Sequence, residues 1–482
     1  MCQFRRAAAA GAVLLGACSF TPDMPTDTAA TLSGASAEFV SLSVAPVSEA
    51  APKSDWWRLF DDRELDGYVT LAFQRNNDLR AAMASLREVR GALSEARSAY
   101  LPLTELGAGA SYQRDEAPLP SLAPDDAEFE FSAGFDLSYE IDLWGRVRNS
   151  VAAARADAEG AEAALHAALV TVAAETARAY ADICAANQQI AVTEETLVLQ
   201  DRTVDLTRRL TSAGHGTNLD VARAKANAEN TRASLPPLKA ARENARFRLA
   251  TLTGQPPRAM VDAAKDCIEV PRVTDVLPVG DGASLIARRP DVREAEKALG
   301  AAAARVGVAT ASLYPTISLG GTITTQALQL ASLREDGAVS FSAGPLISWT
   351  FPNVRASRAQ LRQAEAGMDR ALALFDGTVL TALEETESAL QSYAAELDRI
   401  AALEDAREAA ADAAAMAVVR YELGADDFIS VLDAERTLAD ARIELAQAQA
   451  RASRFQIAVF KALGGGWESA GRVAYTAAAT AP

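Results

Sequence analysis

The chain has 482 residues, is 49% hydrophobic and carries a formal net charge of −17. The negative charge argues against nucleic-acid binding, which requires a basic face. The length and composition allow sizeable cores, but no apolar run reaches the roughly 20 residues that a membrane-spanning helix needs. If the chain crosses a membrane, it must therefore do so with strands.

The first seventeen residues are predicted to be a signal peptide. Arg5 and Arg6 precede an apolar run at 7–15 that is too short to span a bilayer. Small residues then lead to Cys18, an order that resembles the lipobox of bacterial lipoproteins, in which cleavage leaves a lipid-bearing cysteine first. We therefore expect Cys18 to be the lipidation site, although an ordinary signal peptide would also fit. Ser19 favours outer-membrane delivery, and cleavage would change the net charge from −17 to −19 because both arginines leave.

The remaining cysteines and the histidines suggest no catalytic centre. Cys184 and Cys267 could pair in an oxidising periplasm, and the sequence leaves open whether they do. His166 and His215 are the only histidines and stand apart, and no spacing indicates a metal or cofactor site. Nucleophile elbows, phosphate loops and paired catalytic acids are missing from the sequence. We therefore expect a protein that is not an enzyme.

Most of the chain reads as one unit repeated. Residues 78–102 resemble 291–315 at an offset of 213, and FSAG at 131–134 recurs at 341–344. The offset is too long for a solenoid repeat and indicates a duplicated half. The predicted domains are a signal peptide (1–17), a lipid-anchored segment (18–60), a first repeat (61–270), a second repeat (271–468) and a C-terminal tail (469–482).

Each half is predicted to hold one very long helix followed by a shorter one. The helices are expected at 146–213 and 217–254 in the first half, and at 353–423 and 426–463 in the second. The long helices would each measure about 100 Å, so they need long partners. Gly214 and Gly424 mark the two turns, because glycine suits the positive φ of a helix end. A coiled-coil seam with alternating four- and three-residue spacing is expected at Val379, Leu383, Thr386, Leu390, Tyr393, Leu397 and Ile400.

Two strands are expected in each half, at about 103–113 and 129–143, then at about 316–325 and 339–351. In 129–143 the odd positions are apolar and the even positions are polar or small; 339–351 repeats this pattern except at Leu346. Such alternation also fits a soluble half-buried strand. The lengths favour membrane strands, which need about 9–11 residues. Residues 114–128, with three prolines and five acids, are expected to form an exposed loop.

The number of strands bears on assembly. One chain offers four, whereas the smallest membrane barrels have about eight. An open sheet in lipid would leave unpaired edges that a bilayer does not tolerate. Several chains must therefore share one barrel, and we expect an α+β membrane protein with a long helical coiled coil.

Six segments between about Asp55 and Trp467 carry a resemblance to a known family: WWRLFDDREL (56–65), RNNDLRAAMASLREVRGAL (75–93), DLWGRVR (142–148), LIARRPDVREAE (285–296), SLYPTISLGG (312–321) and RYELGADDFISVLDAERTL (420–438). With these segments the chain resembles the TolC-type outer-membrane efflux proteins, nearest to the NodT/OprM-like lipoprotein branch associated with resistance–nodulation–division (RND) drug pumps. This resemblance implies a trimer with a 12-stranded barrel, a periplasmic helical tunnel and an equatorial collar that Cys184 and Cys267 could both reach.

In that family the tunnel closes at the tip where the glycine turns fall. Asp433 matches an aspartate of the constricting ring, and Ile429 matches an apolar ring position one turn earlier. Some relatives have a second aspartate where this chain has Ser430, which puts a double acidic ring in doubt. Asp220 could add charge at the first turn. The simpler alternatives are that Asp433 is a solvated surface acid and that Asp220 only favours the helix dipole.

The resemblance implies the outer-membrane channel of a tripartite efflux system. It would be a passive homotrimeric duct, anchored to outer-membrane lipid and extending into the periplasm. It would carry small molecules from an inner-membrane RND-type pump through a periplasmic adaptor (membrane fusion) protein. Two alternatives are an outer-membrane duct for type I secretion of polypeptides and a coiled-coil lipoprotein scaffold without a pore. The scaffold explains the helices and Cys18 but not the strands.

Overall fold

The computed structural model describes most of the chain between residues 28 and 468. The signal peptide, Cys18, the tail 469–482 and most of the loop expected at 114–128 lie outside the described residues. Those that are described are Thr28, Ala35 and residues 38–43, 46–113, 127–335, 337–352 and 354–468.

The chain divides into two compact units. We call Leu86–Ala161 together with Ala295–Phe375 the sheet unit, and Asp27–Ser85, Glu162–Glu294 and Asp376–Pro482 the helix unit. Four helices contribute residues to both units: α3 (Asn77–Ser98), α4 (Arg146–Ser212), α7 (Pro290–Ala311) and α8 (Arg355–Glu422).

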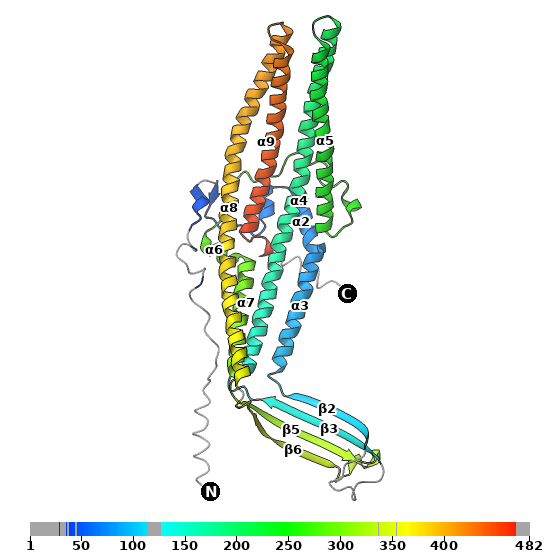
Figure 1. Ribbon diagram of the computed structural model, residues 1–482, viewed down its shortest axis with the longest axis vertical. Helices are drawn as coiled ribbons and strands as arrows, with labels where there is room; N and C mark the ends of the chain where they lie inside the picture. The colour runs from blue at the N-terminus through cyan, green and yellow to red at the C-terminus, as the bar shows by residue number, and fades with distance from the viewer. Residues whose placement is uncertain are drawn as a thin grey trace. The chain divides into compact units, whose positions relative to one another are not determined.

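The sheet unit contains one antiparallel sheet of four strands in the order β2-β3-β5-β6 (Figure 1). Each strand has at least the length that a tilted membrane strand needs. A short 3-10 helix, η6 (Leu330–Arg334), lies between the last two strands in sequence. The strands are β2 (Leu103–Gln113), β3 (Glu128–Glu140), β5 (Thr316–Ala327) and β6 (Val339–Ser348).

The register of the strands gathers the apolar positions on one face. Leu106 pairs with Phe135, Phe135 with Ile323, and Ile323 with Phe341, so one apolar row crosses all four strands. The next residue along each strand belongs to a polar row on the opposite face, because side chains alternate between the two faces of a sheet. That row consists of Glu105, Asp136, Thr322 and Ser342.

Strand β3 ends earlier than the alternation of apolar and polar residues predicted. β3 stops at Glu140, whereas the pattern extended to 143. The reason is local: the Asp142 carboxylate accepts hydrogen bonds from the backbone N–H groups of Val147 and Arg148 at 3.1 and 2.9 Å. The first backbone N–H groups of a helix have no acceptor within the helix. Asp142 accepts two of them at the start of α4, so it stabilises the helix start instead of extending the strand.

The helix unit contains two helical hairpins, α4–α5 and α8–α9, whose turns follow Ser212 and Glu422 (Figure 1). None of the described helices is both long and apolar enough to cross a bilayer. The remaining elements of this unit are η2 (Val40–Ser43), β1 (Val47–Ser48), η3 (Trp56–Phe60), α2 (Arg63–Arg75), α5 (Asn218–Leu252), η5 (Pro257–Met260), β4 (Leu277–Pro278), α6 (Gly282–Arg288) and α9 (Phe428–Ala462), with β1 and β4 paired in parallel.

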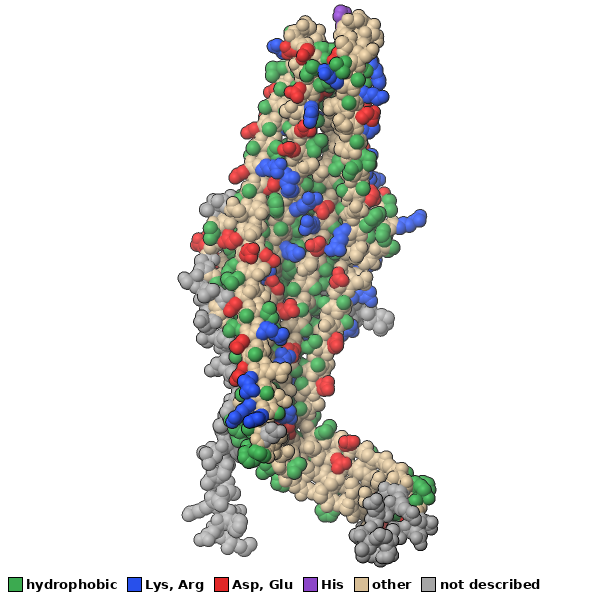
Figure 2. All heavy atoms as spheres, in the orientation of Figure 1, with side chains coloured by type: hydrophobic (Ala, Val, Ile, Leu, Met, Phe, Trp, Pro, Cys, Tyr) green, Lys and Arg blue, Asp and Glu red, His purple; other side chains and the backbone are tan. Residues whose placement is uncertain are grey.

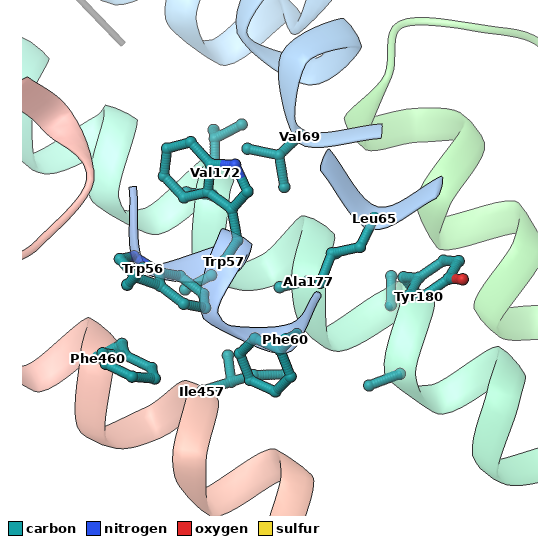
Figure 3. Packing of buried hydrophobic residues seen from close by; sticks show 14 of the residues in the cluster. Trp56, Trp57, Phe60, Leu65, Val69, Val172, Ala177, Tyr180, Ile457 and Phe460 are labelled. Carbon is teal, nitrogen blue, oxygen red and sulfur yellow. The ribbon is translucent and has the colours of Figure 1, made fainter. Parts of the chain in front are cut away.

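An aromatic core holds the helix unit together (Figure 3). Trp56 is fully buried and stacks on Phe460 of α9, with ring centroids 5.0 Å apart. The Trp56 indole N–H donates to the carbonyl of Gly465 at 3.2 Å, so its one polar group is satisfied. Trp57 and Phe60 pack edge-on against Trp56. The short segment before α2 is thereby fixed to α4 and α9.

The predicted coiled-coil seam of α8 lies inside the molecule. Five of its seven positions are buried, and Leu383 and Leu397 are partly buried against the core. Cys184 of α4 and Cys267 form a disulfide, which answers the question that the sequence left open. Asn187, one turn after Cys184, donates to the carbonyls of Ala264 and Cys267, both at 2.9 Å. The segment between the halves is therefore tied to α4 by both covalent and hydrogen bonds.

Candidate functional site

The turns between α4 and α5 and between α8 and α9 have the same backbone geometry. Gly214 has φ +84° and Gly424 has φ +71°, which confirms the positive φ expected for both glycines. The next residue in each turn donates its backbone N–H back into the helix: His215 to Leu210 at 2.9 Å, and Ala425 to Arg420 at 2.8 Å. This pattern satisfies the last helical carbonyls. Nothing crowds either glycine, so backbone conformation alone demands the residue type.

Asp220, predicted as an acid of the first turn, belongs to a helix cap. Its carboxylate accepts the backbone N–H of Thr217 at 3.0 Å, and the Thr217 hydroxyl accepts the backbone N–H of Asp220 at 3.3 Å. This reciprocal pair is a capping box. The Thr217 hydroxyl also lies 2.6 Å from the same carboxylate oxygen. Local structure thus accounts for an acid at this position.

The second turn is capped by residues that the sequence reasoning did not assign. Asp427 accepts hydrogen bonds from the backbone N–H and the hydroxyl of Ser430, at 3.1 and 2.9 Å. Arg420, near the end of α8, reaches Asp426 with two hydrogen bonds of 2.6 and 2.8 Å. The hydrogen bond and charge of Arg420 lower the pKa of Asp426. The signal for the cap was present in the sequence as an acid three residues before a serine at a helix start.

Ile429 and Asp433 lie one turn apart on α9 and both are exposed, Ile429 at 51%. Residues four apart share a helix face, so the two side chains project together. Phe428 and Val431 face the other way and are buried with Val204 of α4 and Ala224 and Ala228 of α5. This cluster, which we call the tip cluster, packs both hairpins of the helix unit together close to their turns.

The apolar face of the sheet is a second candidate functional surface. Leu106 is 82% exposed and Phe341 is 83% exposed within the single chain. β2 and β3 carry acids, and none of the four strands contains lysine or arginine. On the face that Figure 2 shows, Lys and Arg side chains lie over helices, interspersed with Asp and Glu. Strongly exposed apolar rows of this extent indicate an apolar environment or another chain as partner.

Comparison with known proteins identifies relatives along almost the whole chain. The family model described as outer membrane efflux protein matches residues 69–255 and again 283–465. The pyoverdine export outer membrane protein OpmQ of Pseudomonas aeruginosa is 31% identical, over 95% of this chain and 96% of its own length. The outer membrane protein OprJ of the same species is 29% identical, over 95% of each chain. The solved structure of the outer-membrane channel OprN is 35% identical and superposes with a TM-score of 0.88, covering 94% of this chain and all of that one.

Proposed function

Because the chain belongs to the outer membrane efflux protein family, we propose that it is the passive trimeric duct of a tripartite efflux system. Family membership confirms the resemblance stated from the sequence and makes the chain an outer-membrane efflux channel. The proposal adds the finer points: a shared barrel, an acidic aperture, a lipid anchor, and small molecules as cargo. An inner-membrane RND-type pump would supply the energy, and a periplasmic adaptor would join the pump to the duct.

One observation carries the shared barrel: the sheet has a continuous apolar face and two open edges. In the described chain, β2 and β6 each have a neighbouring strand on one side only. Unpaired edges are not tolerated in lipid. The strands alternate in direction, so β6 of one copy and β2 of the next would pair antiparallel. Three copies would close twelve strands; two would reach only the smallest known barrel size, about eight. The resemblance to TolC-type channels favours three.

The aperture is proposed at the tips of the hairpins. Three-fold symmetry would bring three copies of Asp433 around one axis. Like charges at close range repel, so the ring would attract cations. Ile429 on the same helix face would add an apolar constriction that disfavours water. Asp220 would contribute negative charge at the other turn in addition to capping α5. Opening would move the hairpins that end at Gly214 and Gly424.

The domain organisation and the anchor remain proposals as well. Two tandem repeats, 61–270 and 271–468, are supported by the equal lengths of α5 and α9, 35 residues each, and by the two separate family matches. Acylation of Cys18 would anchor the segment 18–60 to the outer membrane. Mass spectrometry of the mature N-terminus would test it, and a chain that starts elsewhere would contradict it.

Deletion of the gene tests the function most directly. The deletion strain should become several-fold more sensitive to a subset of toxic small molecules, and the parent gene should restore resistance. The control is a variant with Phe341→Arg on the apolar face, which should not restore it. Unchanged sensitivity combined with loss of an exported polypeptide would favour the secretion duct instead. No change in either would contradict a role in export.

A further inference from the structure

Helix α5 carries two adjacent prolines near its middle, Pro236 and Pro237, and it continues through both of them. Proline has no backbone N–H, and its ring crowds the carbonyl four residues earlier. The carbonyls of Arg232 and Ala233 therefore cannot accept the usual helical hydrogen bond. The residue before a proline is also disfavoured in helical backbone geometry. Two consecutive bonds are thus missing from the hydrogen-bond ladder of α5, and the helix is weakened at this point.

The facing stretch of α4 also carries residues that favour bending. The hydroxyls of Thr193 and Thr196 donate to the backbone carbonyls of Gln189 and Val192, four residues earlier, at 2.7 and 2.8 Å. Threonines that bond back in this way destabilise a helix slightly and often bend it. Thr193 and Pro237 line the same cavity, so the two weakened stretches lie side by side.

Two ion pairs join α5 to α4, one on each side of the prolines. On the side nearer the turn, Arg232 donates to both carboxylate oxygens of Asp201 at 3.1 Å. On the other side, the Lys239 ammonium lies 3.2 Å from the Glu194 carboxylate. The short segment between these pairs holds the prolines of α5 and Thr196 of α4. The two helices are therefore tied together on both sides of this segment, and they would bend as one unit there.

The packing leaves room beside the prolines. A cavity of about 210 Å³ lies among α4, α5 and α9, and Ser234, Pro237 and Leu238 form its α5 side. Close-packed interiors leave few voids larger than a water molecule, which makes them resist deformation. Leu235 is buried, whereas Pro236 and Pro237 are exposed. Helix α5 therefore has both a weakened backbone and space into which it can bend.

The second hairpin lacks these features. Neither α8 nor α9 contains proline. When the two glycine turns are aligned, Ala446 and Gln447 of α9 stand at the positions of the two prolines. Leu403 and Ala406 of α8 stand where α4 has its two threonines. Alanine and leucine are strong helix formers, so the matching stretch of the second hairpin is the stiffer one.

We propose that the hairpin α4–α5 has a hinge at Pro236 and Pro237, about which its turn end tilts, while α8–α9 remains straight. The tip cluster holds the turn ends of both hairpins together in the structure. The hinge therefore determines which hairpin tilts when that cluster separates. The inference goes beyond the proposed function, because the bending of one hairpin requires neither transport nor a partner protein.

Hydrogen exchange with mass spectrometry tests the weakened segment in the detergent-solubilised protein. The double variant Pro236→Ala with Pro237→Ala restores two backbone donors and should slow exchange of the amides in 229–240 at least tenfold. It should fold, because alanine is the strongest helix former. The control Pro256→Ala with Pro257→Ala changes a second exposed proline pair, which follows α5, and should leave that exchange unchanged. Equal exchange in the parent and the hinge variant would overturn the proposal.

Electron paramagnetic resonance with two spin labels tests the tilt. Labels at Ser212→Cys and Glu422→Cys, the exposed last residues of α4 and α8, report the distance between the turn ends. Cys184 and Cys267 are bonded to each other and take up no label. Co-expression with an excess of unlabelled chains keeps the measured pairs within one chain. The tip cluster should give the parent a narrow distance distribution.

A variant of the tip cluster releases the tilt. Phe428→Ala removes an aromatic ring from this cluster and should broaden the distance distribution at least twofold. Adding Pro236→Ala with Pro237→Ala should make it narrow again, whereas adding the control pair Pro256→Ala with Pro257→Ala should not. Broadening that persists without the hinge prolines, or no broadening in Phe428→Ala, would refute the hinge. Hydrogen exchange decides the question if Phe428→Ala does not fold, because it does not use that variant.

Discussion

At the scale of single residues, one buried cation joins three parts of the helix unit. The side chain of Arg289 is 9% exposed. It donates to Asp291 at 2.6 and 2.9 Å, to Glu385 of α8 at 2.8 Å, and to the carbonyl of Ala462 at the end of α9 at 3.0 Å. Burial alone would raise the pKa of Asp291, but the hydrogen bond and charge of Arg289 outweigh it and lower that pKa.

We expect Arg289→Ala to destabilise the protein by about 3 kcal/mol, because removing one member of a buried ionic group leaves the others uncompensated. The full destabilisation should be present at neutral pH. It should shrink as the pH falls below 3.8, the ordinary value for Asp291, since a depressed carboxyl pKa stabilises the fold only while the acid is ionised. Thermal unfolding at several pH values would measure both effects. The control Arg305→Ala removes an exposed ion pair with Asp157 and should cost less than about 1 kcal/mol.

The aperture prediction rests on two exposed residues of α9. The double variant Asp433→Ala with Ile429→Ala removes the charge and the apolar constriction together. It should raise single-channel conductance in planar bilayers several-fold and weaken block by divalent cations. Asp440→Ala, which removes another exposed acid of α9, should leave both unchanged. If the double variant conducts like the parent, the constriction lies elsewhere.

At the scale of elements, the four strands form one sheet from two distant halves of the chain. β3 and β5 belong to different halves, and their pairing places Phe135 beside Ile323. Neither half alone could build a sheet wider than two strands, which is at best marginally stable in water. The pairing of the halves therefore creates the continuous apolar face.

Two arginine variants of β6 test which face meets lipid. Phe341→Arg on the apolar row should cost about 2–4 kcal/mol if that row lies in the bilayer, and outer-membrane assembly should fall sharply. Ser342→Arg is adjacent on the opposite face and should assemble normally. Heat-resistant oligomer on a gel, together with membrane fractionation, gives the measurement. Equal tolerance of both would argue against a lipid-facing row.

The disulfide is an element-scale constraint between α4 and the segment that joins the two halves. It closes a loop of 83 residues. In the chain-entropy account, a loop of this length contributes about 4.5 kcal/mol. The double variant Cys184→Ser with Cys267→Ser should therefore unfold at lower temperature than the oxidised parent. Reductant should lower the parent's midpoint toward that of the variant and leave the variant unchanged. A parent insensitive to reductant, with two thiols open to alkylation, would contradict the bond.

At the scale of the whole molecule, the proposed shared barrel would pair the two open edges of the described sheet, β2 and β6. Detergent-solubilised protein should therefore have the mass of three chains by light scattering after correction for detergent. Dissociation should require denaturing conditions, because closure of the proposed barrel would remove every strand edge. Ser342→Arg provides a folded control of similar mass. A monodisperse monomer that retains the fold would contradict the shared barrel.

Much of this organisation was readable from the sequence because it depends on local pattern. The alternation along the strands, the heptad-like spacing of α8 and the two glycine turns each follow from residues that are neighbours in the chain. Conformational preference alone explains Gly214 and Gly424, whose φ is positive. The family was likewise recognisable, because its motifs are short and contiguous.

The tertiary structure decided what depends on residues far apart in sequence. Cys184 and Cys267 could be seen as candidates, but only the fold brings their Cα atoms to 5.0 Å. The capping role of Asp220 required the geometry of its turn. Thr203 and Glu435 carry no motif, and the 2.5 Å hydrogen bond between them became visible only when α4 packed against α9. Spacing along a chain predicts which face a side chain occupies, whereas the partner across that face depends on how the helices pack.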